Sequence, residues 1–359
     1  MEPVKTKGRD MSESDKNLEL VTEYPFNAAT PLPALNHALT PNSLTYVRNH
    51  FSIPDLDAKS FRLTMSGAVE PPGAFTLIEL QDLPHKTIPL TLECAGNGRK
   101  SMDPQPKGTP WDYGAVSVIE VTGTSLSKFL ETVGLQENVI ELSFRGADQG
   151  EVEPGRKVSY VRSLPLELAL HPDTLLVWAM NGETLTPEHG FPLRLHVPGW
   201  YGMAAVKWLM EIRALTEPFK GFFQSEHYVY REEVGTAEAE PVREMRVRSL
   251  ITSPLAGDVL PSEVVEITGA AWSGKGHITQ VEVSTDGGAN WGQADLQLPL
   301  SAYEPIRWTF RWNPRASGTY TLLSRASDSS GGSQPLKQRW NKGGYGNNGV
   351  QDITLEILA

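Results

Sequence analysis

The chain has 359 residues, a formal net charge of −11 and one cysteine. A chain of this length is expected to form about two domains, with enough buried apolar surface to fold without disulfides. One cysteine cannot close an internal disulfide, build a C-x-x-C zinc site or attach a c-type haem. The thiol is therefore a buried inert group, a nucleophile or a single metal ligand. The acidic balance argues against a nucleic-acid partner, because such binding needs clustered cations.

The first 22 residues are polar, charged and aperiodic, which predicts a disordered tail. They contain no apolar segment of signal-peptide length, and no later apolar run is long enough to span a bilayer. We therefore expect a soluble protein without a membrane span. Its compartment would be the cytoplasm if the start is natural, and the periplasm if an export signal has been removed.

Residues 23–240 mix strand and helix patterns after an irregular, proline-rich beginning. Their irregular alternation favours an α+β domain over a doubly wound sheet. Period-two or continuous apolar patterns predict strands at 61–69, 86–95, 138–147, 174–182 and 191–199, and helical spacing occurs at 125–134 and 164–171.

The pattern changes after Pro241, where short alternating segments are separated by turn residues. The sequence Asp286-Gly287-Gly288 is a strong hairpin signal. Residues 241–359 are therefore predicted to form an all-β sandwich of immunoglobulin type. The acidic, alanine-rich segment 232–242 is the predicted linker between the two domains.

The single cysteine lies in the segment LTLECAGNGRKS, at the end of an apolar run. Cys94 can be a buried small hydrophobe, as most lone cysteines are. A dinucleotide-binding loop does not fit, because the third glycine of that pattern is replaced by Ser101. The remaining interpretation is a thiolate metal ligand on a strand-end loop, which the neighbouring cations Arg99 and Lys100 would favour.

A second unusual segment, HGFPLRLHVPGWYGMAAVKWL, gathers His189, Arg194 and Lys207 around glycine-containing turns. Core packing explains its leucines and valines but not these three cationic or basic side chains. Cations near glycine-rich turns indicate an anion pocket built from backbone amides and side chains.

Three motifs in one order give the sequence a clear likeness to a known family. They are YVRNH at Tyr46–His50, CAGNGR at Cys94–Arg99, and HGFPLR at His189–Arg194 with VKW at Val206–Trp208. In these motifs the chain resembles the sulfite oxidase family of molybdenum-cofactor enzymes, from about Tyr24 to the C-terminus. The resemblance implies a molybdenum–molybdopterin cofactor in residues 23–240 and a homodimer formed through the C-terminal sandwich.

The resemblance also implies a role for each motif residue. Cys94 would ligate molybdenum through sulfur, a soft donor suited to this metal. Arg48 and Arg99 would hold the substrate, Tyr228 would donate a hydrogen bond to it, and Trp111 would wall its pocket. The residues implied to hold the cofactor are Tyr46, Val47, Arg48, Asn49, His50, Cys94, Asp148, His189, Arg194, Ala205, Val206 and Lys207.

Three of these assignments leave an alternative open. Trp111 can be an ordinary core tryptophan, and Asp148 can lie in a solvated turn. Tyr228 can be a half-buried aromatic residue, with Tyr201 and Tyr230 as nearby competitors.

The chain departs from the family pattern at two positions. The family often has two arginines after C-A-G-N, whereas here Gly98 precedes Arg99. The segment RWNKGGYGNN resembles a W-N-x-R-G stretch, but Gly343 stands where the family has an arginine. Lys342 beside it can supply a point charge but not a bidentate fork.

The implied activity is molybdenum-dependent two-electron oxidation of sulfite to sulfate. Because the sequence shows no haem or flavin motif, the electrons would pass to an external acceptor, expected to be a c-type cytochrome, with oxygen as an alternative. A nitrate reductase-like activity, another sulfur-compound oxidoreductase of the same fold and a non-enzymatic binding protein are the other interpretations.

Overall fold

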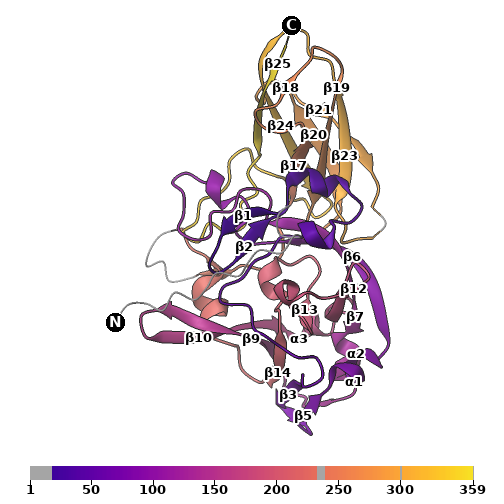
Figure 1. The fold of residues 1–359 in the computed structure, drawn as a ribbon, viewed down its shortest axis with the longest axis vertical. Helices are drawn as coiled ribbons and strands as arrows, with labels where there is room; N and C mark the ends of the chain where they lie inside the picture. The colour runs from indigo at the N-terminus through magenta and orange to yellow at the C-terminus, as the bar shows by residue number, and fades with distance from the viewer. Residues whose placement is uncertain (1–17, 233–238, 300, 359) are drawn as a thin grey trace.

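The computed structural model describes residues 18–232, 239–299 and 301–358. Figure 1 shows a broad larger domain and a narrow β-sandwich, with the C-terminus at the far end of the sandwich. The described residues contain no helix that is long and apolar enough to cross a membrane.

Two five-stranded sheets form the frame of the larger domain. One buried strand, β11 (Leu175–Met180), is a continuous apolar run and was predicted from the sequence within 174–182. Its neighbour β7 (Val116–Ser125) is also mostly buried but was not predicted, because polar residues interrupt its apolar ones. The first sheet has the order β10 (Arg156–Pro165), β9 (Glu141–Glu153), β14 (Leu209–Leu215), β3 (Leu63–Gly67) and β5 (Gly73–Phe75). The second has the order β12 (Glu183–Thr184), β11 (Leu175–Met180), β7 (Val116–Ser125) and β6 (His85–Glu93), with β13 (Arg194–His196) also paired to β11.

The α-helices of the larger domain are short, so strands dominate the predicted α+β domain. The helices are α1 (Leu77–Gln81), α2 (Leu126–Leu130) and α3 (Leu166–Ala169). The two predicted helical segments appear as α2 and α3, but only over five and four residues. At α3 the first part of the predicted helix belongs to strand β10 instead, because Pro165 fixes an extended N-cap before the first turn.

The C-terminal part is a sandwich of two sheets, as predicted. Ile267, Val281, Trp308 and Leu322 fill the space between the sheets. One sheet has the order β17 (Arg248–Ser253), β19 (Val265–Trp272), β23 (Ile306–Trp312) and β22 (Asp295–Gln297). The other has the order β18 (Val259–Leu260), β25 (Asp352–Ile357), β24 (Gly318–Asp328), β20 (Ile278–Ser284) and β21 (Gly292–Gln293).

The ends of the predicted domains differ from the structure in detail. Ordered structure begins earlier than predicted, because β1 (Glu19–Thr22) pairs with β2 (Asn27–Ala29); residues 1–17 of the predicted tail lie outside the described residues. Part of the predicted linker, 233–238, also lies outside them, while β16 (Glu240–Pro241) pairs with β15 (Val229–Tyr230).

The sandwich is packed firmly onto the larger domain. Val242, Leu250 and Trp272 belong to the same apolar cluster as Leu63 and Phe144 of the larger domain. The two parts therefore share one core where they meet.

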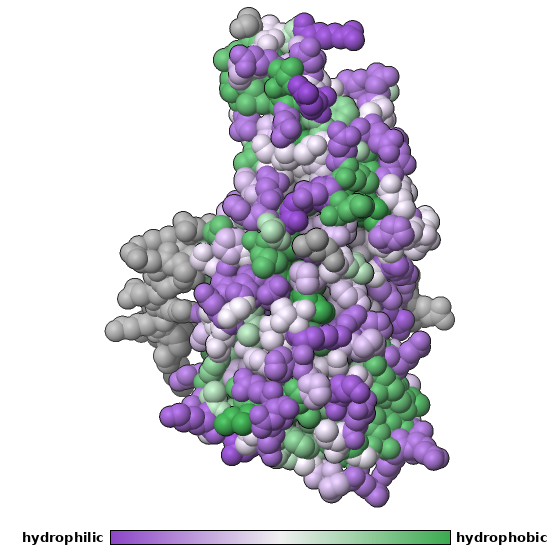
Figure 2. Space-filling view, turned by 90° about the vertical axis from the view of Figure 1, so that its right-hand side faces the viewer, coloured by the Kyte–Doolittle hydropathy of each residue, from purple (hydrophilic) through white to green (hydrophobic). Residues whose placement is uncertain are grey.

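The face of the molecule in Figure 2 is mostly polar, with separate apolar patches that include one at the far end of the sandwich and one low on the larger domain.

Candidate active site

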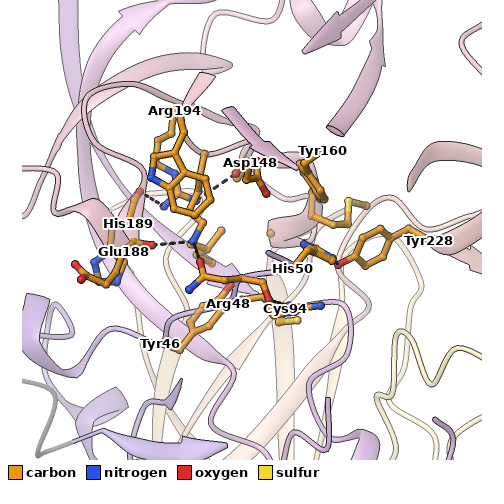
Figure 3. A pocket seen from close by; sticks show the side chains of 17 residues that line it. Tyr46, Arg48, His50, Cys94, Asp148, Tyr160, Glu188, His189, Arg194 and Tyr228 are labelled. Carbon is orange, nitrogen blue, oxygen red and sulfur yellow. Dashed lines mark hydrogen bonds between the residues drawn. The ribbon is translucent and has the colours of Figure 1, made fainter. Parts of the chain in front are cut away.

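Two adjoining cavities meet at Cys94, and we call them the inner and the outer pocket. Cys94, Arg48 and Tyr228 line both. The inner pocket is also lined by Tyr46, Asn49, His50, Leu92, Asp148, Tyr160, Glu188, His189, Arg194, Gly202, Met203, Ala205, Lys207 and Trp208. The outer pocket is also lined by Gly96, Arg99, Lys107, Gly108, Thr109, Glu226, His227, Val229, Arg231, Lys342, Gly343 and Tyr345. Figure 3 shows the inner pocket with His189 and Arg194 on one side and Tyr228 on the other.

The thiol sits on a tight loop directly after strand β6. The Cys94 amide donates to the Ala115 carbonyl at 2.9 Å, and the Asn97 amide donates to the Cys94 carbonyl at 2.9 Å. A Cβ atom on Gly96 would lie 2.6–2.8 Å from the Arg99 guanidinium, so a larger residue there would push this guanidinium out of its present position. The loop thus holds a 6% exposed sulfur at the junction of the two pockets.

The sandwich supports this loop from behind through a buried ion pair. Arg248 Nη1 lies 2.8 Å from Glu93 Oε1, and each side chain is 1% exposed. Trp272 donates from its indole nitrogen to Glu93 Oε2 at 2.9 Å. Arg248 also donates to the Asn97 carbonyl at 3.3 Å, so β17 of the sandwich fixes both ends of the loop that carries Cys94.

The inner pocket holds cations that the described residues neutralise only in part. Arg194, 4% exposed, donates to the carbonyls of His189 and Ala205, while its Nε is buried without a partner in the described chain. Lys207 donates to Asn49 Oδ1 and to the Glu188 carbonyl. Burial lowers the pKa of Arg194 to about 10, and burial with the nearby Arg194 charge lowers the pKa of Lys207. An anionic ligand in this pocket would offset the free-energy cost of burying the charges of Arg194 and Lys207.

Both inner-pocket histidines are neutral at pH 7. Burial lowers the pKa of His189 to about 3, and Lys207 and Arg194 add to the effect. The pKa of His50 is also lowered, by burial and then by Arg48. His50 Nε2 and the Tyr228 hydroxyl share a 2.8 Å hydrogen bond, and the His50 ring stacks on Tyr160.

Tyr228 follows the π-helix Phe222–His227 and is the tyrosine of the three candidates that reaches the site. Tyr201 lines neither pocket; its hydroxyl accepts from the Arg246 amide. Tyr230 lies outside both pockets. Burial raises the pKa of Tyr228 to about 12, with Arg48 opposing the shift, so the hydroxyl stays protonated and can donate.

The other predicted site residues differ in where they lie relative to the two pockets. Asp148 lines the inner pocket and is 5% exposed, so a solvated turn is wrong; burial raises its pKa to about 6. Val47 and Val206 are buried next to lining residues but do not line either pocket. Trp111 is fully buried in the core cluster that contains Cys94 and Tyr46, outside the lining of both pockets.

The outer pocket places two arginines beside the thiol. Arg99 is 5% exposed and donates to the carbonyls of Gly343 at 3.1 Å and Thr109 at 2.7 Å. Arg48 donates to the Asn49 carbonyl and to Asn27 Oδ1. Further cations from Lys107, Arg231 and Lys342 line the same pocket. Such a setting attracts a small anion.

Several lining residues were not predicted from the sequence. Glu188 and Trp208 adjoin predicted motif residues, so the motifs pointed close to them. Tyr160 comes from a segment that carries no predicted site residue, and His227 directly precedes Tyr228. Tyr345 lies in the segment RWNKGGYGNN, which the sequence marked only for Gly343 and Lys342. Only the folded arrangement brings them to the thiol.

A strand-rich domain with a cationic inner pocket, joined to a β-sandwich, is the architecture of a molybdopterin-dependent oxidoreductase. Residues 50–223 match the oxidoreductase molybdopterin binding domain, and residues 239–356 match the Mo-co oxidoreductase dimerisation domain. Sulfite oxidase of Arabidopsis thaliana is 32% identical, with 95% of this chain and 94% of that protein covered. The chain belongs to the sulfite oxidase family.

Other similar proteins are longer or differ in named activity. Mitochondrial sulfite oxidase of Rattus norvegicus is 32% identical over 95% of this chain, but the chain spans only 66% of its length. Plant nitrate reductase of Brassica napus is 34% identical, and the chain spans 43% of it. The sulfane dehydrogenase SoxCD from Paracoccus pantotrophus superposes with a TM-score of 0.82 at 29% identity, covering 100% of this chain and 95% of that chain.

The described residues fit the family's molybdenum–molybdopterin cofactor. The unpartnered Nε of Arg194 and the buried ammonium of Lys207 suit an anionic group such as the phosphate of a pterin. The described residues contain no cluster of three or more His, Cys, Asp or Glu that could hold a metal. Cys94 offers one sulfur ligand.

Proposed function

We propose that the protein oxidises sulfite to sulfate and passes two electrons to an external acceptor. The observation that carries this proposal is the position of Cys94, between a cationic pocket that fits an anionic pterin and a second pocket that carries Arg48 and Arg99. The molybdenum cofactor supplies the two-electron redox chemistry when it is bound. In the overall reaction sulfite gains an oxygen atom from water, and two electrons and two protons are released.

The chain's own residues bind and orient the substrate. Arg48 and Arg99 attract the anion and fix its oxygens by charge-assisted hydrogen bonds. Tyr228 donates a hydrogen bond to one oxygen, and its own position is held by the 2.8 Å contact with His50. Arg99 and Tyr228 are buried and hydrogen-bonded within the chain, so they need little reorganisation to stabilise developing charge.

Cys94, Arg48, Arg99 and Tyr228 are the proposed catalytic residues. The proposed cofactor-binding residues that line the inner pocket are Tyr46, Arg48, Asn49, His50, Cys94, Asp148, His189, Arg194, Ala205 and Lys207. Val47 and Val206 would contribute through their backbone only. The proposed role of Trp111 is limited to packing behind the thiol loop.

A c-type cytochrome is the proposed electron acceptor, and a homodimer through residues 239–356 is the proposed assembly. The net charge of −11 favours a basic carrier. Turnover with such a carrier should fall with added salt, whereas turnover with a neutral dye should not. Sedimentation of the purified protein would show whether it is dimeric.

Oxidation of a sulfane-type sulfur compound is a second candidate function. It is favoured by the likeness to the sulfane dehydrogenase structure and by Gly343, which removes a cation from the outer pocket. Nitrate reduction is a further alternative, whose support is the 34% identity to the nitrate reductase of Brassica napus.

Metal analysis and substrate-dependent dye reduction separate these functions. We expect about one molybdenum per chain, dye reduction with sulfite, less with thiosulfate, and no oxidation of a reduced dye by nitrate. Faster reduction with thiosulfate than with sulfite would favour the second candidate. A natively produced protein without molybdenum would support a binding protein instead.

A further inference from the structure

A loop of the sandwich domain, residues 341–346, returns to the thiol and forms one wall of the outer pocket. The Gly346 amide donates to the Ala95 carbonyl at 2.8 Å, which ties this loop to the residue after Cys94. Asn341 closes the loop by accepting from the Tyr345 amide at 3.0 Å and donating to the Tyr345 carbonyl at 2.8 Å. Tyr345 is therefore held in a fixed position beside the catalytic loop.

The Tyr345 ring is buried among residues of the site, but its hydroxyl is not used. The residue is 5% exposed, and its ring lies 5.0 Å from that of Tyr228 and 5.2 Å from the Arg99 guanidinium carbon. The hydroxyl has no hydrogen-bond partner within the described chain, and it is not among the fully buried unpaired atoms. Because Tyr345 lines the outer pocket, this hydroxyl is available to a ligand there.

The Tyr345 ring also explains the glycine at position 343. A Cβ atom on Gly343 would lie 2.4 Å from Tyr345 Cε2 and 2.6 Å from Cδ2, so a side chain at 343 and this ring cannot occupy the same space. The family arginine expected at 343 is thus excluded by Tyr345. On this wall of the outer pocket, the neutral Tyr345 hydroxyl thus stands in place of the arginine of the family.

We propose that Tyr345 is a substrate-contacting residue, whose hydroxyl donates a hydrogen bond to a small sulfur oxyanion held by Arg48 and Arg99. Burial raises the pKa of Tyr345, so the phenol remains a donor at neutral pH. A phenol donates one oriented hydrogen bond but carries no charge. The pocket is therefore expected to depend less on the charge of the oxyanion than a site with three arginines would. This inference rests on the proposed function in one respect, namely that the bound anion is a sulfur oxyanion.

Sulfate binding to the oxidised holoenzyme tests the proposal without turnover. Calorimetry should show that Tyr345→Phe weakens sulfate binding about tenfold, as expected for one hydrogen bond to a charged acceptor. This variant keeps the ring against Arg99. The matched control is Tyr320→Phe, which removes the hydroxyl of a half-buried sandwich tyrosine that donates to the Ala316 carbonyl, and it should bind sulfate like the wild type.

Unchanged sulfate binding by Tyr345→Phe would overturn the proposal. If Tyr345→Ala then weakened binding, Tyr345 would act only by packing against Arg99. Because sulfate binding needs no turnover, a holoenzyme that binds sulfate through Tyr345 but does not oxidise sulfite would contradict the proposed function alone.

A second pair of variants tests the exclusion of an arginine. Gly343→Arg should bind sulfate poorly because its side chain collides with the Tyr345 ring. Gly343→Arg with Tyr345→Ala should bind sulfate at least tenfold more tightly than Gly343→Arg alone, because the added guanidinium gains room to reach the anion. Equal affinities of these two variants would contradict the exclusion.

Discussion

The inner and outer pockets share Cys94, Arg48 and Tyr228, but they are built in different ways. The inner pocket comes from the larger domain alone, and most of its lining lies in the three motifs or next to them. The outer pocket adds Lys342, Gly343 and Tyr345, which come from a loop of the sandwich domain. The inner pocket is thus built within one domain, whereas the outer pocket depends on how the second domain packs.

Both departures from the family pattern are explained by the second domain. A Cβ atom on Gly98 would lie 2.7 Å from Arg248 Nη2 and 2.9 Å from Asn347 Nδ2, and the residue has a φ of +78°. Gly343 is matched to Tyr345 in the same way. The chain thus changes the substrate half of the site through sandwich residues while it keeps the cofactor half.

The largest difference in effect is expected between two variants, one that removes an arginine of the inner pocket and one that removes an arginine of the outer pocket. Arg194→Met should lose most of its molybdenum, because the inner pocket loses the cation with an unpartnered Nε. Arg99→Met should keep the wild-type molybdenum content, while its kcat/KM for sulfite falls about 10- to 100-fold through loss of charge-assisted hydrogen bonds. Metal analysis and steady-state kinetics measure both effects. Equal loss of molybdenum in the two variants would remove the distinction between the pockets.

The buried ion pair behind the thiol loop is expected to have the next largest effect. Arg248→Met leaves Glu93 buried without its partner, and the free energy of unfolding should fall by about 3–5 kcal/mol. The control is Arg325→Met, which breaks the partly exposed pair with Glu282 and should cost only about 0.2–1 kcal/mol. Urea unfolding compares them. Similar losses would show that the sandwich does not hold the loop through this pair.

The smallest predicted effect concerns acid stability at the outer pocket. Burial, followed by the charges of Arg48 and Arg99, lowers the pKa of His227 from its usual value of about 6.5 to about 4. The unfolded chain therefore binds a proton at a higher pH than the folded chain. Stability from the neutral His227 is present above pH 6.5 and is lost as the pH falls toward 4, by about 3 kcal/mol.

His227→Gln should remove this part of the acid sensitivity. The free energy of unfolding, measured at pH 7 and pH 4, should change less in this variant than in the wild type. His277→Gln, at an exposed position of the sandwich, serves as the control and should retain the wild-type difference. An unchanged pH dependence in His227→Gln would contradict the assigned neutral state of His227.

The sequence pointed to Cys94, Arg194 and Lys207, which line the inner pocket together, because each stands in a short motif. Their roles toward a cofactor remain a prediction. The sequence did not predict the Arg248–Glu93 pair or the position of Tyr345, because these contacts join residues that are 155 and about 250 positions apart. Such contacts depend on how two domains pack, which no local pattern records. The short α2 and α3 were overestimated for the opposite reason: local helical spacing was overridden by the neighbouring strands.

The central claim is that the Cys94 sulfur binds the metal. X-ray absorption at the molybdenum edge, on wild-type holoenzyme and on Cys94→Ser, tests it directly. We predict one fewer sulfur neighbour of molybdenum in Cys94→Ser, with sulfite oxidation abolished and the circular dichroism of the fold unchanged. An identical number of sulfur neighbours in both proteins would contradict the account.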